Sequence, residues 1–213
     1  MAIRLVIFDM DGVVFEGRNF WLDLHTRLGT QTEALALADR YLRADYHRLS
    51  EITVRELWKG CSAAPMFRLV SERRYQAGVF EVFSSLRARN IRSALVTSGP
   101  LLLAQRAQRD LKIDLVRANH VFIEDERFVG RVDVQVSDPD KATVGCAVMQ
   151  YFDVEAHDTA MVGDSESDAP LARKVGLPIA YDSDSEILDE ACSHHLPHGE
   201  LRRLTGLIDV SSS

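Results

Sequence analysis

The chain has 213 residues, an apolar fraction of 46% and a charged fraction of 27%, which are ordinary for a globular protein of one large or two small domains. The formal net charge of −7 argues against a nucleic-acid partner, because nucleic-acid phosphates are bound by basic surfaces. No apolar run is long enough to cross a membrane, and the chain enters an apolar segment at once, so we expect neither a membrane partner nor a signal peptide.

The first predicted element is a buried strand that ends in two aspartates. Residues 3–8 read Ile-Arg-Leu-Val-Ile-Phe, and Asp9, Asp11 and Gly12 follow directly. Open α/β sheets place their ligands at the carboxyl ends of such strands. Two carboxylates at this position require a cation or a proton to balance them. The pattern therefore predicts a metal ion and a reaction, although a lone Asp-x-Asp pair is otherwise often only a solvated loop.

The next segment, residues 15–77, is rich in Leu, Ala, Arg and Glu and has almost no β-branched runs. Its apolar residues Leu35, Ala38, Leu42 and Leu49 recur close to helical spacing. Helices are predicted over residues 31–49, 53–59 and 66–76. We expect a small helical cap domain at 15–77, inserted after the first strand of a core formed by residues 1–14 and 78–213.

After residue 78 the pattern alternates between helices and strands. Helices are predicted over 79–89, 101–111, 141–152 and 168–175, and strands over 91–97, 121–123, 128–136, 159–162 and 177–181. The strands 121–123 and 128–136 form a predicted hairpin around the polar turn 124–127. This alternation is typical of an α/β protein, and we expect a three-layer Rossmann-like core with a parallel sheet.

Polar residues follow several of these strands, and in a parallel sheet they meet at one edge. Their combined chemistry suits phosphoryl transfer, in which a phosphate dianion must be neutralised before a carboxylate approaches it. Asp9 and Asp164 are the natural side-chain ligands for a Mg²⁺ ion, and Lys141 supplies a further positive charge. Asp11 is placed to donate a proton to the leaving oxygen.

The remaining candidates are supporting or binding groups. Ser98 and Gly99 offer a hydroxyl and backbone N–H groups to phosphate oxygens, with Thr97 as a competing hydroxyl. Asp168 is expected to support Lys141 or the metal site. The alternative is that its negative charge only stabilises the N-terminus of the following helix. Three widely spaced cysteines form no disulfide or metal pattern, which indicates a reduced, cytoplasmic protein.

Four ordered segments resemble the motifs of the haloacid dehalogenase superfamily of phosphatases. They are Asp-Met-Asp-Gly-Val at 9–13, Val-Thr-Ser-Gly at 96–99, Lys141, and Gly-Asp-Ser-Glu-Ser-Asp at 163–168. The helical insertion, the Ser-Gly form of the second motif, and Arg-Ala-Asn-His at 117–120 before the hairpin are most similar to the phosphoserine phosphatase branch.

This resemblance implies a Mg²⁺-dependent phosphomonoesterase with an aspartyl-phosphate intermediate. It assigns Asp9 as nucleophile and Asp11 as general acid and then base, with Mg²⁺ held by Asp9, the backbone carbonyl of Asp11, and Asp164. Phosphoserine is the leading substrate that it suggests, and Glu16 is the nearest counterpart of the branch's substrate-reading glutamate. Arg18, at the start of the cap, is a second expected substrate contact.

Alternatives remain open at this stage. The acceptor is water in a phosphatase and an alcohol in a phosphotransferase. A sugar phosphate or a methionine-salvage intermediate is the alternative to phosphoserine as the substrate. A phosphorylatable switch without turnover is a third possibility, which Asp11 and the cap argue against. The sequence gives no indication of the oligomeric state.

Overall fold

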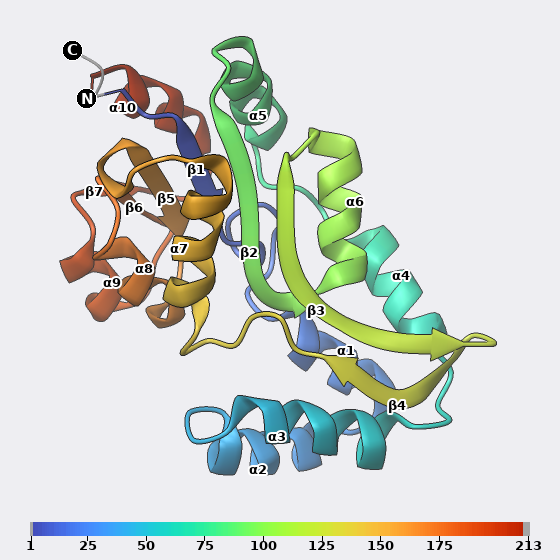
Figure 1. Cartoon of the computed structure of the whole chain (residues 1–213). Helices are drawn as coiled ribbons and strands as arrows, with labels where there is room; N and C mark the ends of the chain where they lie inside the picture. Colours follow the sequence, from blue (N-terminus) through green and yellow to red (C-terminus); the bar gives the residue numbers. More distant parts are fainter. Residues whose placement is uncertain (1, 211–213) are drawn as a thin grey trace.

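A computed structural model describes residues 2–210 and contains a seven-stranded sheet (Figure 1). The strands are β1 (Leu5–Phe8), β2 (Arg92–Pro100), β3 (Leu115–Glu124), β4 (Arg127–Asp133), β5 (Thr159–Gly163), β6 (Leu177–Tyr181) and β7 (His194–Leu196). Their order across the sheet is β4-β3-β2-β1-β5-β6-β7. All neighbours are parallel except β3 and β4, so the expected parallel sheet carries an antiparallel edge strand.

The helices fall into an inserted group and a core group. The inserted group is α1 (Phe20–Leu28), α2 (Gln31–Tyr41), α3 (Tyr46–Ile52), the π-helix η1 (Thr53–Trp58) and α4 (Ala64–Glu72). The core group is α5 (Val79–Ala88), α6 (Leu101–Leu111), α7 (Lys141–Phe152), α8 (Ala169–Ala172), α9 (Glu186–Ala191) and α10 (Leu204–Val210), with short 3-10 turns at Ala156–Asp158, Glu166–Asp168 and Leu201–Arg203. Within residues 2–210, none of these helices has the length and apolar character needed to cross a membrane.

Side-chain alternation along the central strands produces the three layers. Val6 and Phe8 of β1 belong to one hydrophobic cluster, which also contains the buried faces of α5, α6 and α10. Leu5 and Ile7 belong to a second cluster on the opposite face, with α7, α8 and α9. Because successive strand residues point to opposite faces, a fully apolar strand such as β1 is buried between two helical layers.

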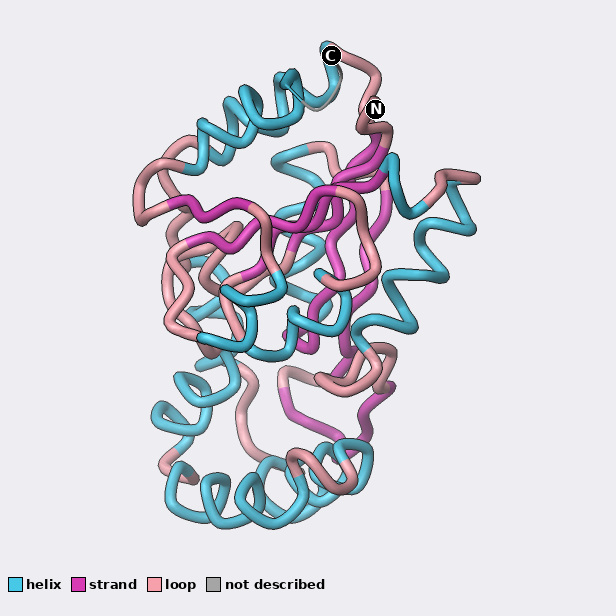
Figure 2. The backbone as a smooth tube through the Cα atoms, turned by 90° about the vertical axis from the view of Figure 1, so that its left-hand side faces the viewer, coloured by secondary structure: helices cyan, strands magenta, loops and turns pink. Residues whose placement is uncertain are grey.

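The inserted helices α2 and α3 lie at one end of the molecule, whereas α4 lies beside α6 of the core (Figure 1). In Figure 2, α2 and α3 form a layer below the sheet, and both termini lie at the opposite end. Phe20, Leu24 and Trp58 of this group are buried in the same cluster as Phe8 of the core. The inserted segment also contacts the hairpin of β3 and β4. The Gly60 backbone N–H, which follows η1, donates to the Phe128 carbonyl of β4 at 2.8 Å.

Several predicted elements coincide with the structure. The helices at 101–111 and 141–152 and the strand at 177–181 have the predicted bounds, and the hairpin turn lies where the sequence indicates it. The predicted helix 31–49 is in fact two helices, and 53–59 is a π-helix. The structure adds α9 and the edge strand β7, which the sequence did not predict.

Candidate active site

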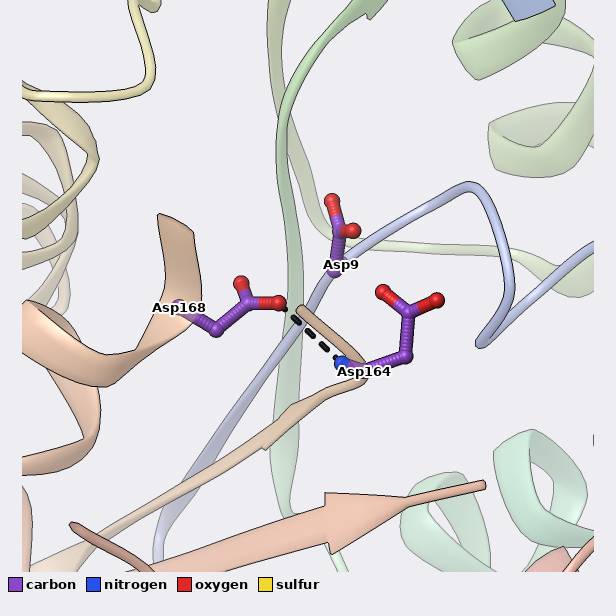
Figure 3. Close-up of side chains that lie close together, drawn as sticks. All are labelled: Asp9, Asp164 and Asp168. Carbon is purple, nitrogen blue, oxygen red and sulfur yellow. Dashed lines mark hydrogen bonds between the residues drawn. The ribbon is translucent and has the colours of Figure 1, made fainter. Parts of the chain in front are cut away.

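The carboxyl end of β1 forms the centre of the site. β1 lies between β2 and β5 in register, and the Asp9 backbone N–H donates to the Val162 carbonyl at 2.9 Å, which extends the pairing to Asp9. This places Asp9 opposite the end of β5, from which Asp164 follows. Figure 3 shows the carboxyl groups of Asp9, Asp164 and Asp168 converging at this edge. One carboxylate oxygen from each lies within 4.8 Å of the others.

Lys141, the first residue of α7, connects two of these carboxylates. Its Nζ lies 2.8 Å from Asp9 Oδ1 and 2.5 Å from Asp168 Oδ1, and all three side chains are buried. The other Asp168 oxygen accepts from the backbone N–H groups of Asp164 at 3.1 Å and Ser165 at 3.2 Å. Asp168 therefore contacts both the lysine and the loop that carries Asp164, and its supporting role stays a prediction.

The site contains more buried negative charge than its lysine can balance. Burial raises the pKa of Asp9 to about 7, against the opposing effect of Lys141. Burial, with the charges of Asp9 and Asp168, raises the pKa of Asp164 to about 8. Burial lowers the pKa of Lys141, but Asp168 and Asp9 outweigh this effect and raise it above its ordinary value. An additional cation with a preference for oxygen ligands fits this cluster of carboxylates.

Asp11 lies apart from this cluster and close to the cap. Its Oδ2 accepts from the Phe20 backbone N–H at 3.2 Å, and its Oδ1 is buried without a hydrogen-bond partner, 3.8 Å from Arg73 Nη2. Burial raises the pKa of Asp11 to about 6, although the charge of Arg73 lowers it. A carboxyl group in this state can retain a proton near neutral pH and deliver it to a substrate.

The loop between Asp9 and the cap depends on Gly12. Its φ is +81°, and a Cβ at this position would lie 2.0 Å from Asp164 Oδ2. Gln76, a buried residue that sequence reasoning did not identify, donates from Nε2 to the Gly12 carbonyl at 2.8 Å. Glycine thus lets the β1 loop approach Asp164 closely, and Gln76 fixes the loop there.

The end of β2 supplies the predicted phosphate-binding segment. The Gly99 N–H donates to Thr97 Oγ1 at 2.9 Å, and both Thr97 and Ser98 border the cavity above Asp9. The Ser98 carbonyl accepts from Trp21 Nε1 at 2.9 Å and from the Tyr46 hydroxyl at 3.3 Å. Two cap residues therefore contact the backbone of this segment, and the choice of Ser98 over Thr97 as the binding hydroxyl stays a prediction.

Asn119 of β3 joins this segment to the loop before Lys141. Its Nδ2 donates to the carbonyls of Ser98 at 2.9 Å and Val136 at 2.8 Å, and its Oδ1 accepts from the N–H groups of Gln135 and Val136. Sequence reasoning used residues 117–120 only for the resemblance and did not assign this role. A single buried asparagine in a strand was the available signal, because a buried amide must have its hydrogen bonds satisfied.

The predicted site residues divide between two cavities. A cavity of about 680 Å³ is bordered by Asp9, Asp11, Arg18, Ser98, Gly99, Lys141 and Asp164. Arg18 Nη1 lies 3.4 Å from Asp164 Oδ2 and 3.4 Å from Asp184 Oδ1, and Arg18 Nη2 donates to the Asp182 carbonyl at 2.6 Å. Glu16 borders a separate cavity of about 520 Å³, with Arg73 and Arg74. The structure thus brings Arg18 to the catalytic cluster but not Glu16.

Comparison with known sequences identifies similar proteins. The family model described as haloacid dehalogenase-like hydrolase matches residues 6–173. A phosphoserine phosphatase of Archaeoglobus fulgidus is 26% identical over 191 residues, covering 88% of this chain and 55% of that protein. A phosphoserine phosphatase of Idiomarina loihiensis is 25% identical over 182 residues, covering 84% of this chain and 82% of that protein. The chain thus spans about half of the first relative and most of the second.

Solved structures share the fold. A phosphoserine phosphatase with a phospho-aspartyl intermediate analogue superposes with a TM-score of 0.82 at 19% identity, covering 97% of this chain and 99% of that chain. A HAD family hydrolase from Salmonella enterica superposes with a TM-score of 0.84 at 17% identity, covering 98% of this chain and 72% of that chain. These likenesses establish a common architecture from end to end of the described chain.

Proposed function

This chain belongs to the haloacid dehalogenase-like hydrolase family, and we propose that it is a Mg²⁺-dependent phosphomonoesterase acting through an aspartyl-phosphate intermediate. The observation that carries the proposal is the buried contact of Lys141 with Asp9 and Asp168, next to Asp164. This cluster combines a carboxylate nucleophile with the charge needed to receive a phosphate dianion.

Asp9, Asp164 and the backbone carbonyl of Asp11 would hold the metal ion. Their oxygens suit Mg²⁺, and the excess of buried carboxylates in this structure fits a divalent cation. The ion would supply positive charge that neutralises the phosphate oxygens. Asp168 is committed to Lys141 and to two backbone N–H groups, so we assign it a supporting role.

Asp9 attacks the phosphorus atom of the ester, and the bond between phosphorus and the ester oxygen breaks. Asp11 gives its proton to the departing alcohol. Asp11 then removes a proton from a water molecule, which attacks the aspartyl-phosphate, so that phosphate leaves and Asp9 is regenerated. Lys141 and the Ser98 hydroxyl hold the phosphate oxygens during both steps. The Gly99 N–H, which donates to Thr97 Oγ1 in this structure, would exchange that hydrogen bond for one to a phosphate oxygen when substrate binds.

Residues 15–77 act in this proposal as a cap that covers the site and contacts the organic part of the substrate. The names of the relatives make phosphoserine the leading substrate to test. Arg18 is retained as a substrate contact, and Glu16 would need a rearrangement of the cap to reach the catalytic cavity. The free thiols of Cys61, Cys146 and Cys192 support a cytoplasmic location.

Replacing the nucleophile tests the proposal. Asp9→Asn should reduce Mg²⁺-dependent phosphate release to below about one-thousandth of the wild-type kcat/KM, because no covalent intermediate can form. Asp39→Asn, at an exposed position of α2, is the matched control and should retain full activity. Turnover by folded Asp9→Asn protein at the wild-type rate would refute the assignment.

A phosphotransferase is the second candidate, since the cap could exclude water in favour of an alcohol. Product analysis separates the two reactions. Phosphate released in step with substrate loss, in the presence of candidate alcohols, supports hydrolysis, whereas a new phosphate ester identifies transfer.

A further inference from the structure

The cap side of the catalytic cavity is an apolar wall. It is formed by Leu35 and Ala38 of α2, Leu42 directly after α2, Leu49 of α3 and Trp58 of η1, all of which border the cavity that contains Asp9. Leu35 is 53% exposed and Leu42 is 37% exposed, although large apolar side chains at helical spacing usually face a packed core. We refer to these five residues as the apolar wall.

Apart from the Thr53 hydroxyl, the polar cap groups beside the apolar wall already have partners. Trp21 Nε1 and the Tyr46 hydroxyl donate to the Ser98 carbonyl, and the Ser50 hydroxyl donates to the Tyr46 carbonyl at 2.9 Å. His25 Nδ1 lies 2.7 Å from Thr30 Oγ1 and accepts from Trp58 Nε1 at 3.3 Å. These groups are engaged in holding the cap together, so they offer little to a polar substrate.

The charged groups on the cavity are also largely committed. Among the described residues of the cap, no Asp or Glu borders this cavity. Its two cap cations are paired with core acids, Arg18 with Asp164 and Asp184, and Arg43 with Glu166 at 3.1 Å. Asp138 is the remaining core carboxylate on the cavity outside the catalytic cluster.

An amino-acid phosphate would need partners for both an ammonium and a carboxylate group. Asp138 is available for the ammonium, but a substrate carboxylate would compete with Glu166 for Arg43 and with Asp184 for Arg18. Replacing one of these exposed pairs gains little, because such pairs contribute about 0.2–1 kcal/mol, and a carboxylate left unpaired beside leucine side chains carries a free-energy cost. An uncharged organic group meets no such cost and gains from the burial of its apolar surface.

We propose that this enzyme prefers phosphomonoesters whose organic part is uncharged and apolar, an alkyl chain or aromatic ring that packs on the apolar wall. The inference rests on the proposed phosphatase function, and it departs from the substrate that the relatives' names suggest. The cavity volume of about 680 Å³ agrees with it, because cavities of about 300–1,000 Å³ accommodate drug-sized ligands.

A series of primary alkyl phosphates tests the preference, because their leaving alcohols are chemically alike. We expect kcat/KM to increase by about threefold to fourfold for each methylene added between ethyl and hexyl phosphate. Phosphoserine should be a poorer substrate than hexyl phosphate. A flat series, or a higher kcat/KM for phosphoserine than for hexyl phosphate, would overturn the preference while leaving the phosphatase function intact.

A charge placed in the apolar wall tests its location. Leu42→Glu should reduce the ratio of kcat/KM for hexyl over ethyl phosphate by about tenfold or more. Ile187→Glu is the matched control, because Ile187 is a similarly exposed apolar residue of α9 that does not border the cavity. If the ratio of kcat/KM for hexyl over ethyl phosphate were unchanged in Leu42→Glu, the alkyl group of the substrate would bind elsewhere.

A binding measurement separates this inference from the catalytic proposal. Hexylphosphonate cannot be hydrolysed, and titration calorimetry should show that it binds more tightly than ethylphosphonate by about 30-fold or more, with the difference reduced in Leu42→Glu. If these affinities differ as expected but no ester is hydrolysed, the phosphatase function fails and the apolar site stands. Equal affinities for the two phosphonates would overturn the apolar site.

Discussion

Gly12 shows how one residue type controls the catalytic cluster. Its φ is positive, and a Cβ added there would lie only 2.0 Å from Asp164 Oδ2, so the site has no space for a side chain. We expect Gly12→Ala to lower the free energy of unfolding by about 1–2 kcal/mol, because of its left-handed backbone. Activity should fall by about 100-fold, because the methyl group displaces the Asp164 carboxylate.

Gly199 provides the control for this prediction. It has a φ of +78°, but a Cβ there would have no neighbour within 4 Å. Gly199→Ala should therefore show a similar loss of stability in chemical denaturation with no loss of kcat. If both variants lost activity equally, backbone strain rather than displacement of Asp164 would be the cause.

At the residue scale, the sequence predicted that the side chains of the catalytic cluster lie together, because parallel strands end at one edge of the sheet. Asp9, Lys141, Asp164 and Asp168 needed only the order of strands and loops to be brought together. The role of Asn119 was not assigned from the sequence, because its five hydrogen bonds depend on where Tyr46 and two distant loops lie. The position of Glu16 depends in the same way on the path of the chain into the cap.

At the element scale, α1 carries a buried histidine that is held in its neutral form. Trp58 Nε1–H can only donate, so His25 Nδ1 accepts and the ring proton lies on Nε2. Burial lowers the pKa of His25 to about 4, against the opposing charge of Glu33. Between the ordinary value near 6.5 and this value, the unfolded chain binds a proton that the folded protein does not.

The free energy of unfolding should therefore fall as the pH decreases from about 6.5 to about 4, and His25 should account for about 1–2 kcal/mol of this loss after allowance for partial solvent screening. Urea denaturation across this range should show a shallower dependence in His25→Asn. His47→Asn, at an exposed position of α3, is the control and should keep the wild-type slope. If the free energy of unfolding depended on pH equally in the wild type and both variants, His25 would not be the source of this dependence.

The hairpin between β3 and β4 has a turn whose second central residue is unfavourable. Asp125 and Glu126 have φ values of 47° and 57°, and such two-residue turns accept Asp at the first position but prefer Gly at the second. Glu126→Gly should raise the free energy of unfolding by about 0.5–1 kcal/mol in chemical denaturation. Glu124→Gly, in the adjacent strand, should instead lower it by a similar amount. If Glu126→Gly instead lowered the free energy of unfolding, the Glu126 side chain would contribute more to stability than its backbone conformation costs.

Prediction of the cap helices from the sequence was least accurate where their apolar side chains line a cavity and do not pack against other helices. The spacing of Leu35, Ala38, Leu42 and Leu49 predicts one helix, whereas the structure has two helices that are separated after Tyr41, and Leu35 and Leu42 line a cavity and are exposed. Periodicity identifies an apolar face but not what covers it. The π-helix η1 likewise depends on tertiary packing, because Trp58 is held by His25 and by the ring of Phe128.

At the scale of the whole molecule, exposed ion pairs connect the cap to the core. Arg43 pairs with Glu166, and Arg18 with Asp184, across the cavity. Screening lengths fall from about 10 Å to about 3 Å between about 0.1 M and 1 M salt, which weakens such pairs. We expect KM to rise over this range, and the rise to be smaller in Arg43→Ala.

Arg92→Ala is the control, because Arg92 forms its exposed ion pair with Asp114 within the core. It should keep the wild-type salt dependence of KM, measured with the same substrate. Each exposed pair contributes about 0.2–1 kcal/mol, so neither variant should unfold at a markedly lower denaturant concentration. Identical salt dependence in both variants would exclude a role for the Arg43 pair in holding the cap.

The central place of β1 in the sheet has a consequence for biosynthesis. Leu5–Phe8 leaves the ribosome before its two neighbours, which begin at Arg92 and Thr159. At about 5–20 residues per second, the nascent strand waits roughly 10–30 s for its second neighbour. During that interval the most apolar tetrapeptide near the amino end is unprotected, which makes it a natural target for chaperones that act on growing chains.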